Sequence, residues 1–345
     1  MTMIERNLES SNLDNRTDKD ILVEVKNLKK YFPIKGGILK RTIGQVKAVD
    51  GVSFSIIKGE TLGVVGESGS GKSTLGRVIL RLLDPTEGNV VFDDVDISYL
   101  SQRKIRPQRK DMQIVFQDPF ASLNSKMSVG QLVEEPLIVQ GLLSKKDRVK
   151  QVSEIITKVG LRKGDLQKYP HEFSGGQRQR ISIARALVVN PKFVICDEPV
   201  SALDVSIQAQ VLNLMKDLQE ELGLTYLFIA HDLSVVKHIS DRVAVMYLGR
   251  FVELASKKAL YNNALHPYTR ALLSSIPVID IDKEPAKKVE KIKLQGDLPS
   301  PANPPSGCTF RTRCPYAYDR CTSEVPELIE LEENHFVACH LYTEK

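Results

Sequence analysis

The octapeptide Gly66-Glu67-Ser68-Gly69-Ser70-Gly71-Lys72-Ser73 is the most informative part of this chain. It fits the pattern G-x-x-x-x-G-K-[ST], in which glycines let consecutive backbone N–H groups turn toward the oxygens of a phosphate. An apolar run at 61–65 precedes it, and a stretch with helical periodicity follows at 74–83. A strand, a glycine loop and a helix in this order favour a phosphate-binding loop, because the helix N-terminus adds positive potential.

The residues at the end of this loop include two side chains with defined chemical uses. Lys72 supplies a point charge for the β and γ phosphates of a nucleotide, and Ser73 supplies a hydroxyl ligand for Mg²⁺. Thr74 is counted with the nucleotide-binding residues. The ordinary alternative is a flexible Gly/Ser turn, which the flanking strand and helix disfavour.

A second group of chemical interest is a pair of carboxylates. The apolar run 193–196 predicts a buried strand, and Asp197 and Glu198 follow it directly. Asp197 is placed to hold Mg²⁺, and Glu198 can orient an attacking water or accept its proton. A strand that simply ends in solvated acids is common, so the pair gains its meaning from the glycine loop. Cys196, inside the apolar run, is interpreted as a small core residue.

Composition is that of an ordinary globular protein with a mild basic excess. The 345 residues include 48 basic and 43 acidic side chains, a formal net charge of +5. This balance does not indicate nucleic-acid binding by itself, and it also suits a position near an anionic membrane surface. No stretch approaches the ~18 apolar residues of a membrane span, and residues 1–20 lack the apolar core of a signal peptide. We therefore expect a cytosolic chain with a flexible N-terminal tail at 1–20.

Hydrophobic periodicity predicts an α/β protein. Residues 35–45 are rich in Gly and Lys and predict a loop, whereas 128–168 show helical patterns and no strand. Strands that alternate with helices around a glycine loop indicate a parallel sheet covered by helices, with the block 128–168 inserted as a subdomain. The predicted strands are 21–28, 52–57, 61–65, 112–116, 193–196, 225–230 and 243–247, and the principal helices are 74–83, 177–189 and 207–222.

A second glycine-rich helix start lies at Phe173-Ser174-Gly175-Gly176-Gln177. Two glycines and a serine before a helix make another nest of backbone N–H groups suited to an anion. One chain rarely needs two nests for the same phosphate, and the ordinary alternative is a capped helix without a ligand. The pentapeptide resembles the signature motif of ABC ATPases, in which the first residue is usually leucine.

Other motifs of that family occur in the expected order. Gln117 matches the glutamine loop, Ser201-Ala202-Leu203-Asp204 matches the D-loop, and His231 matches the switch histidine. Tyr31 resembles the aromatic residue that stacks on adenine; Phe32 is a competing choice, and packing is another role for either.

The resemblance covers residues 21–265 and implies a P-loop NTPase of the ABC-cassette type. Such a cassette has a RecA-like parallel core, an antiparallel β subdomain and an inserted helical subdomain, here expected at about 118–178. No internal repeat is visible, so a single cassette is expected.

The resemblance also implies a role for each matched residue. Glu198, His231 and Gln117 are expected to act in catalysis, with Mg²⁺ held by Ser73, Asp197 and Gln117. The implied nucleotide contacts are Tyr31, Gly66, Glu67, Ser68, Gly69, Ser70, Gly71, Lys72, Ser73, Thr74, Ser174, Gly175, Gly176, Gln177 and Asp204.

Hydrolysis is expected to need two chains. The charge of a triphosphate must be neutralised from all sides as the terminal phosphoryl group departs, and the loop 66–73 covers only one side. The family implies that the nest 174–177 of a second subunit covers the other side. ATP then joins the two subunits, and the helical block carries their movement to a membrane partner.

Residues 266–345 are expected to form an extension that follows the cassette. The stretch His266-Pro267-Tyr268-Thr269-Arg270-Ala271-Leu272-Leu273 resembles the start of the C-terminal extension of oligopeptide and dipeptide importer ATPases. Taken alone, a His-Pro pair is a helix-entry turn. The composition shifts after Pro277, and the prolines of 299–305 indicate a linker before a small cysteine-bearing module.

The four cysteines of this module are Cys308, Cys314, Cys321 and Cys339. In a reducing cytosol, clustered cysteines indicate a metal site more than disulfides. Four thiolates suit zinc or an iron–sulfur cluster, and the spacing, which lacks tight C-x₂-C pairs, does not decide between them. The family resemblance implies a structural [4Fe–4S] cluster, with zinc or unligated core thiols as the alternatives.

The resemblance implies an ATPase that powers import of dipeptides or oligopeptides from the cytoplasmic face of the cell membrane, as a peripheral subunit. The implied partners are two transmembrane permease subunits, a second ABC ATPase that is commonly a different chain, and an extracytoplasmic peptide-binding protein, with no nucleic acid. Nickel or glutathione as cargo stays open, as does pairing of the chain with itself.

Two other function classes are weighed against transport. A soluble ABC ATPase that acts on ribosomes or DNA usually carries two cassettes or a long coiled coil, and neither pattern is present. A nucleotide-binding regulator without turnover is disfavoured because Glu198 and His231 are both present.

Overall fold

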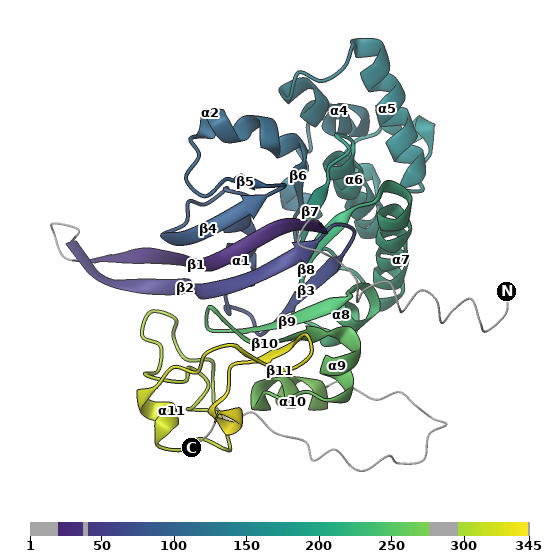
Figure 1. The fold of residues 1–345 in the computed structure, drawn as a ribbon. Helices are drawn as coiled ribbons and strands as arrows, with labels where there is room; N and C mark the ends of the chain where they lie inside the picture. Colours follow the sequence, from purple (N-terminus) through teal and green to yellow (C-terminus); the bar gives the residue numbers. More distant parts are fainter. Residues whose placement is uncertain (1–19, 37–40, 276–295, 344–345) are drawn as a thin grey trace, which may run out of the picture.

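Two β-sheets organise the residues that the computed structural model describes, which are 20–36, 41–275 and 296–343 (Figure 1). The expected tail at 1–20 lies outside these ranges except for Asp20, and so does the part of the expected linker at 277–295. The expected α/β architecture is confirmed, with a parallel core, an antiparallel sheet and a block of helices.

The central sheet carries the parallel core. Its strand order is β11 (Ile329–Glu332), β12 (His335–Val337), β10 (Arg250–Ser256), β9 (Arg242–Tyr247), β3 (Thr61–Val65), β8 (Thr225–Ala230), β7 (Phe193–Asp197) and β6 (Met112–Val115). The strands from β9 to β6 run parallel, whereas β10, β12 and β11 pair antiparallel. Every residue of β3 and β8 is buried, as expected for a parallel sheet covered on both faces.

The second sheet is antiparallel, in the order β2 (Arg41–Ile57), β1 (Ile21–Gly36), β4 (Glu87–Phe92) and β5 (Val95–Asp96). β1 and β2 form a long hairpin whose pairing extends from Ile21 opposite Ile57 to Gly36 opposite Arg41. The prediction of a loop over 35–45 was therefore wrong for residues 35–36 and 41–45. Cross-strand pairing outweighs a local composition rich in Gly and Lys, which single-segment propensity does not register.

The helices close the core on both sides of the central sheet. α1 (Lys72–Ile79) contacts the antiparallel sheet, whereas α6 (Gly175–Leu187) contacts β6 and α8 (Leu233–Ile239) contacts β3 and β8. Alternate residues of β8 divide between two apolar clusters, with Phe228 on the side of the helical block and Ile229 on the side of the antiparallel sheet. The remaining helical segments are α2 (Gln102–Ile105), η3 (Arg106–Lys110), α7 (Val205–Leu222), α9 (Lys257–Asn262), α10 (Pro267–Ser274), α11 (Arg320–Ser323) and η6 (His340–Tyr342).

Between β6 and β7, and before α6, the chain forms a helical block of α3 (Pro119–Ser122), α4 (Val129–Val139), α5 (Lys145–Lys158), η4 (Lys163–Gln167) and η5 (Pro170–Glu172). α4 begins at a capping box, in which Ser128 and Gln131 each accept a hydrogen bond from the other's backbone N–H. α7 ends at Gly223, whose left-handed φ of 64° stops the helix as its sequence position indicated. Figure 1 shows this block at the opposite end of the molecule from the C-terminal extension.

The C-terminal extension is joined to the cassette by buried hydrogen bonds to one carboxylate. The carboxylate of Glu253 on β10, which is 0% exposed, accepts hydrogen bonds from Leu265 N at 2.8 Å and His266 N at 2.9 Å. His335 on β12 brings its Nε2 to 2.8 Å from Glu253 Oε1 and is 1% exposed. The extension is therefore continuous with the central sheet and not a detached module, because β12 pairs directly with β10.

The His-Pro pair at 266–267 is a helix-entry turn, as predicted. His266 Nδ1 accepts a hydrogen bond from Tyr268 N at 3.0 Å and caps α10. Burial lowers the pKa of His266 to about 4, so the imidazole is neutral and its nitrogen is free to accept this hydrogen bond.

Candidate functional site

The glycine loop between β3 and α1 is packed closely on the backbone beneath it. A Cβ at Gly66 would lie 2.1 Å from Met246 O, and one at Gly71 would lie 2.0 Å from Ala48 O. Gly71 also has a φ of 106°, a left-handed conformation that other residues rarely adopt. Glycine is thus required at both ends of the loop, which wraps tightly around the N-terminus of α1.

Lys72 folds back over this loop. Its Nζ donates to Gly66 O at 2.8 Å and to Glu67 O at 3.0 Å, and the residue is buried. Burial lowers the pKa of Lys72, whereas the nearby carboxylates of Glu198 and Asp197 act in the opposite direction. The ammonium group therefore lies inside the loop, between its backbone and the two carboxylates predicted to act on Mg²⁺ and water.

Ser73 and Asp197, two of the oxygen ligands that the sequence predicted for Mg²⁺, lie side by side. Ser73 Oγ donates to Asp197 Oδ1 at 2.7 Å, and Arg77 Nη2 lies 4.0 Å from Asp197 Oδ2. Burial raises the pKa of Asp197, and the Ser73 hydroxyl and the Arg77 guanidinium oppose that shift. A hydroxyl and a carboxylate side by side suit a hard divalent cation, so the residues present fit Mg²⁺.

The three predicted catalytic residues lie together, because Glu198 contacts both of the others. Its Oε2 accepts a hydrogen bond from Gln117 Nε2 at 3.0 Å and lies 3.3 Å from His231 Nδ1. Glu198 has a φ of 48°, and its backbone N donates to Ile229 O at 2.9 Å. The left-handed conformation costs roughly 1–2 kcal/mol in a residue other than glycine, a cost typical of functional sites.

The nest at 174–177 is an exposed helix start. Ser174 caps α6 in a capping box with Gln177, whose backbone N lies 3.4 Å from Ser174 Oγ and whose Oε1 lies 3.0 Å from Ser174 N. A Cβ at Gly176 would lie 2.5 Å from Ile207, and one at Gly175 would lie 3.3 Å from Leu203. The glycines are therefore needed for packing of α6 against the start of α7.

No hydrogen bond or ion pair within 20–36, 41–275 and 296–343 joins residues 174–177 to the loop 66–74. Asp204, the last residue of the predicted D-loop, caps α7 by accepting from Ile207 N at 3.0 Å. The two nests thus lie on separate parts of the chain, and Asp204 already has a local structural role.

Tyr31 lies beside the loop on the β1–β2 hairpin. It pairs with Lys47, the neighbour of the Ala48 carbonyl that lies beneath Gly71. Its hydroxyl donates to Asp50, which Arg250 also binds through Nη2 at 2.6 Å and Nε at 3.0 Å. Burial, followed by the hydrogen bond to Asp50, raises the pKa of Tyr31.

Sequence reasoning missed the contacts of Glu67 with the C-terminal extension. Its carboxylate binds Arg313 Nη1 at 2.9 and 3.1 Å, and its backbone N donates to Tyr268 Oη at 3.0 Å. The motif placed Glu67 among nucleotide contacts, whereas its side chain here is directed to Arg313. No sequence pattern pairs residues so far apart along the chain.

The four cysteines predicted to hold a metal group are free thiols in the C-terminal extension. Burial raises the pKa of Cys308 to about 11 and that of Cys339 to about 12, and the neighbouring thiols add to both shifts. In the part of the chain that the structure describes, however, no three His, Cys, Asp or Glu side chains are arranged to hold a metal ion. The cysteines therefore share one module without forming a metal site of that kind.

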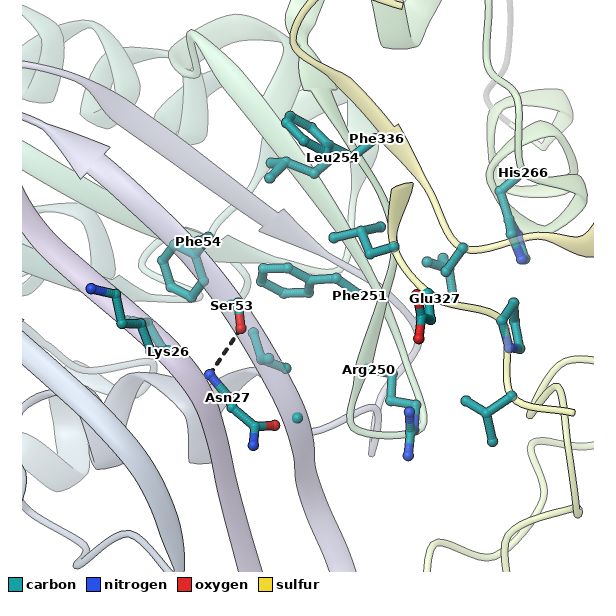
Figure 2. Close-up of a pocket in the computed structure, with 18 of the residues that line it drawn as sticks. Lys26, Asn27, Ser53, Phe54, Arg250, Phe251, Leu254, His266, Glu327 and Phe336 are labelled. Carbon is teal, nitrogen blue, oxygen red and sulfur yellow. Dashed lines mark hydrogen bonds between the residues drawn. The ribbon is translucent and has the colours of Figure 1, made fainter. Parts of the chain in front are cut away.

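A large hollow in the described residues lies away from the glycine loop. A cavity of about 940 Å³ lies between the antiparallel sheet, β10 and the extension, whereas a pocket of about 40 Å³ lies beside Glu198 and His231. Figure 2 shows Asn27 and Ser53 on one wall of the larger cavity and Phe251 and Glu327 on others. Of the predicted site residues only Cys308 lines it, so cavity size does not identify the catalytic centre.

Replacement of Gly71 by alanine is expected to abolish the loop geometry. The Cβ would overlap Ala48 O and add left-handed strain, so we expect the dissociation constant for ATP to rise about 100-fold or more. Equilibrium titration of the full chain with ATP in EDTA measures this without turnover.

Gly59→Ala is the matched control for this substitution. Gly59 also has a left-handed φ, of 80°, but a Cβ there meets nothing within 4 Å. We expect a loss of stability of about 1–2 kcal/mol and unchanged ATP affinity. Normal ATP binding by Gly71→Ala would contradict the geometry described for the loop.

Comparison with known proteins shows the family to which this chain belongs. The ABC transporter family model matches residues 49–201, and a model of the C-terminal region of oligopeptide/dipeptide transporters matches residues 252–321. The oligopeptide transport ATP-binding protein AppF of Bacillus subtilis is 58% identical over 94% of this chain and 99% of its own length. A putative peptide import ATP-binding protein of Brucella ovis is 53% identical over 92% of this chain and 97% of its own.

Solved structures place the fold in the same family. The ATP-binding cassette MJ0796, in a dimeric post-hydrolysis state with ADP and Pi, has 31% identity and a TM-score of 0.61, covering 68% of this chain and 99% of its own. CbiO1 of Clostridium perfringens, part of an ABC transporter complex, has 32% identity and a TM-score of 0.62, covering 71% and 92%. The chain therefore belongs to the ABC transporter family of ATPases, in the group that carries the oligopeptide/dipeptide transporter C-terminal region.

Proposed function

We propose that this chain hydrolyses ATP to power import of dipeptides or oligopeptides by an ABC transporter. The observation that carries the proposal is the contact of one carboxylate, Glu198, with both Gln117 and His231, next to the Ser73–Asp197 pair. The peptide-transport names of the relatives and the matched C-terminal region support the cargo class. Nickel or glutathione remains the alternative cargo, because none of the proposed catalytic residues would touch the cargo.

The residues of the site divide the chemistry of hydrolysis among them. The backbone of the loop 66–71 and the Lys72 ammonium would bind the β and γ phosphates. Mg²⁺, held by Ser73 and Asp197, would neutralise charge on the phosphate oxygens when bound. Glu198 would orient the attacking water and accept its proton, and Gln117 would help to fix that carboxylate.

His231 would contact the γ-phosphate from the end of β8. Its side chain is exposed, so it can turn from Glu198 toward a bound nucleotide. A second ATPase subunit would supply its own residues 174–177 to the opposite side of the triphosphate. The exposure of Ser174 and Gln177 in this chain supports that arrangement, and either an identical or a different subunit could provide it.

Glu198→Gln is expected to bind ATP with normal affinity and to lose at least about 100-fold in turnover, because the amide cannot accept a proton. The variant should accumulate as an ATP-bound dimer. Steady-state phosphate release and size-exclusion chromatography with ATP measure the two effects. Asp217→Asn, an exposed carboxylate on α7, is the control and should hydrolyse ATP normally. Normal turnover by Glu198→Gln would reject its assignment as the catalytic base.

We infer that the helical block contacts membrane permeases. The end of α4 and the turn after it expose Ile138, Val139 and Leu143, a small apolar patch suited to a protein partner. No helix in the described residues is long and apolar enough to cross a bilayer. The permeases, and through them an extracytoplasmic peptide-binding protein, would then hold the chain peripherally at the cytoplasmic face of the membrane.

Ile138→Glu tests the permease contact, because this side chain is 54% exposed and a charge there should leave the fold intact. We expect loss of co-purification with the permeases and retention of ATP binding, since a charge is costly in an apolar interface. Ile43→Glu, on the β1–β2 hairpin and 72% exposed, is the control. Equal recovery of permeases with both variants would argue against this surface.

The four cysteines are proposed to bind a structural [4Fe–4S] cluster. Their gathering in one module and the mutual influence of their thiols support the proposal. A single zinc ion, with Zn–S bonds of about 2.3 Å, needs thiolates closer together than an eight-atom cluster does. That the described residues hold no site for one metal ion is therefore compatible with a cluster.

Anaerobically purified protein is expected to contain about four iron and four sulfide per chain. Cys314→Ser should lose most of both, whereas Cys196→Ser, a substitution in the buried strand β7, should retain them. Metal analysis by plasma mass spectrometry and sulfide assay makes the comparison. Stoichiometric zinc, or no metal in freshly isolated protein, would contradict the cluster.

A further inference from the structure

We propose that Arg313 is a positioning residue for the phosphate-binding loop, through which the C-terminal extension sets the affinity of the loop for ATP. The inference rests on the proposed function, because it requires that the loop 66–71 binds the phosphates of ATP. It assigns to the extension a direct effect on nucleotide binding, in addition to any structural use of its cysteines.

The contact between the two parts of the chain is a mostly buried ion pair, in which one guanidinium nitrogen reaches both oxygens of a carboxylate. Arg313 Nη1 lies 2.9 Å from Glu67 Oε2 and 3.1 Å from Oε1, with side chains 8% and 26% exposed. Charge pairs shielded from water interact more strongly than exposed ones, and truncation of one partner leaves the other unpaired. Glu67 is thus held by a residue more than two hundred positions further along the chain.

Glu67 is a sensitive point in the loop because its backbone holds other parts of the cradle. Its carbonyl accepts hydrogen bonds from Lys72 Nζ at 3.0 Å and from Ser70 N at 3.2 Å. A shift of Glu67 would therefore move the lysine that faces the phosphates and the turn that presents the backbone N–H groups. Small misplacements of such groups weaken charge-assisted hydrogen bonds strongly.

The extension supports Arg313 on a rigid base. Tyr268, which accepts the Glu67 N–H, packs against Tyr247 and Phe310 with ring centroids 4.7 and 5.4 Å apart. Phe310 is buried, and its carbonyl accepts a hydrogen bond from Arg313 N at 3.0 Å. Tyr247 follows Met246, whose carbonyl lies beneath Gly66. The aromatic cluster and the ion pair therefore hold the same end of the loop from one side.

Arg313→Gln and Glu67→Gln in the full chain test the inference from both sides of the contact. We expect each to raise the dissociation constant for ATP about 5- to 30-fold, with the midpoint of thermal unfolding and the iron content close to those of the wild type. Arg313→Lys should recover part of the affinity, since it keeps the charge without the guanidinium geometry. Titration with ATP in EDTA measures binding alone.

Two further variants separate positioning from general support of the extension. The double exchange Glu67→Arg with Arg313→Glu should bind ATP more tightly than either single exchange, because it restores an ion pair. Arg311→Gln is the matched control: Arg311 lies in the same segment, but within the described residues its side chain bonds to Ser306, through Nε at 2.8 Å and Nη2 at 3.3 Å. Its ATP affinity should equal that of the wild type.

The split between binding and turnover gives the final criterion. In the assembled transporter, Arg313→Gln should raise the KM for ATP while kcat at saturation stays within about twofold, since the residue does not touch the reacting atoms. Wild-type affinity in both glutamine variants would overturn the inference alone. Failure of the wild-type chain itself to bind ATP would overturn the proposed function, and the inference with it.

Discussion

The parallel register of three neighbouring strands is the constraint on which the rest of this structure depends. β3 pairs with β8 so that Val65 lies opposite Ala230, and β7 pairs with β8 so that Asp197 lies opposite Ile229. Since parallel strands end on the same edge of a sheet, the residues that follow them meet there. Lys72, Glu198 and His231 come from three distant segments and reach one edge for this reason.

The same constraint explains why the loop is built from glycine and why its surroundings are rigid. The loop packs against the edge of the sheet because its backbone approaches other backbone atoms closely. This approach leaves no space for a Cβ atom at Gly66 or Gly71. The neighbouring strands β3 and β8 are buried on both faces, so the sheet cannot shift to make room for a Cβ atom. Local geometry and global packing thus favour the same conformation.

Much of this arrangement follows from local sequence patterns. Continuous apolar runs correctly predicted the strands at 61–65 and 225–230, and a glycine correctly marked the end of α7 at Gly223. Motif order predicted that Gln117, Glu198 and His231 belong together, and the structure brings their side chains into contact. These successes share a cause, since each depends on residues close in sequence or on a recurrent order of motifs.

What the sequence could not reveal depends on pairing over long distances. The hairpin at 35–36 and 41–45 is stabilised by its partner strand, and its own composition resembles that of a loop. The ion pair of Glu67 with Arg313 and the buried contact of Glu253 with His335 join segments for which no periodic or spacing rule exists. Such contacts arise from the tertiary fold, so they become visible only when the fold is known.

The C-terminal hairpin of β11 and β12 also changes the edge of the central sheet. By pairing with β10, β12 occupies backbone groups that would otherwise be available to a strand from another molecule. The edge strand is now β11, which has only four residues and in which Glu330 and Glu332 alternate with apolar side chains. A short edge strand bearing negative charge is a poor template for further strand addition, so the extension replaces the longer edge of β10 with one less suited to pairing with another chain.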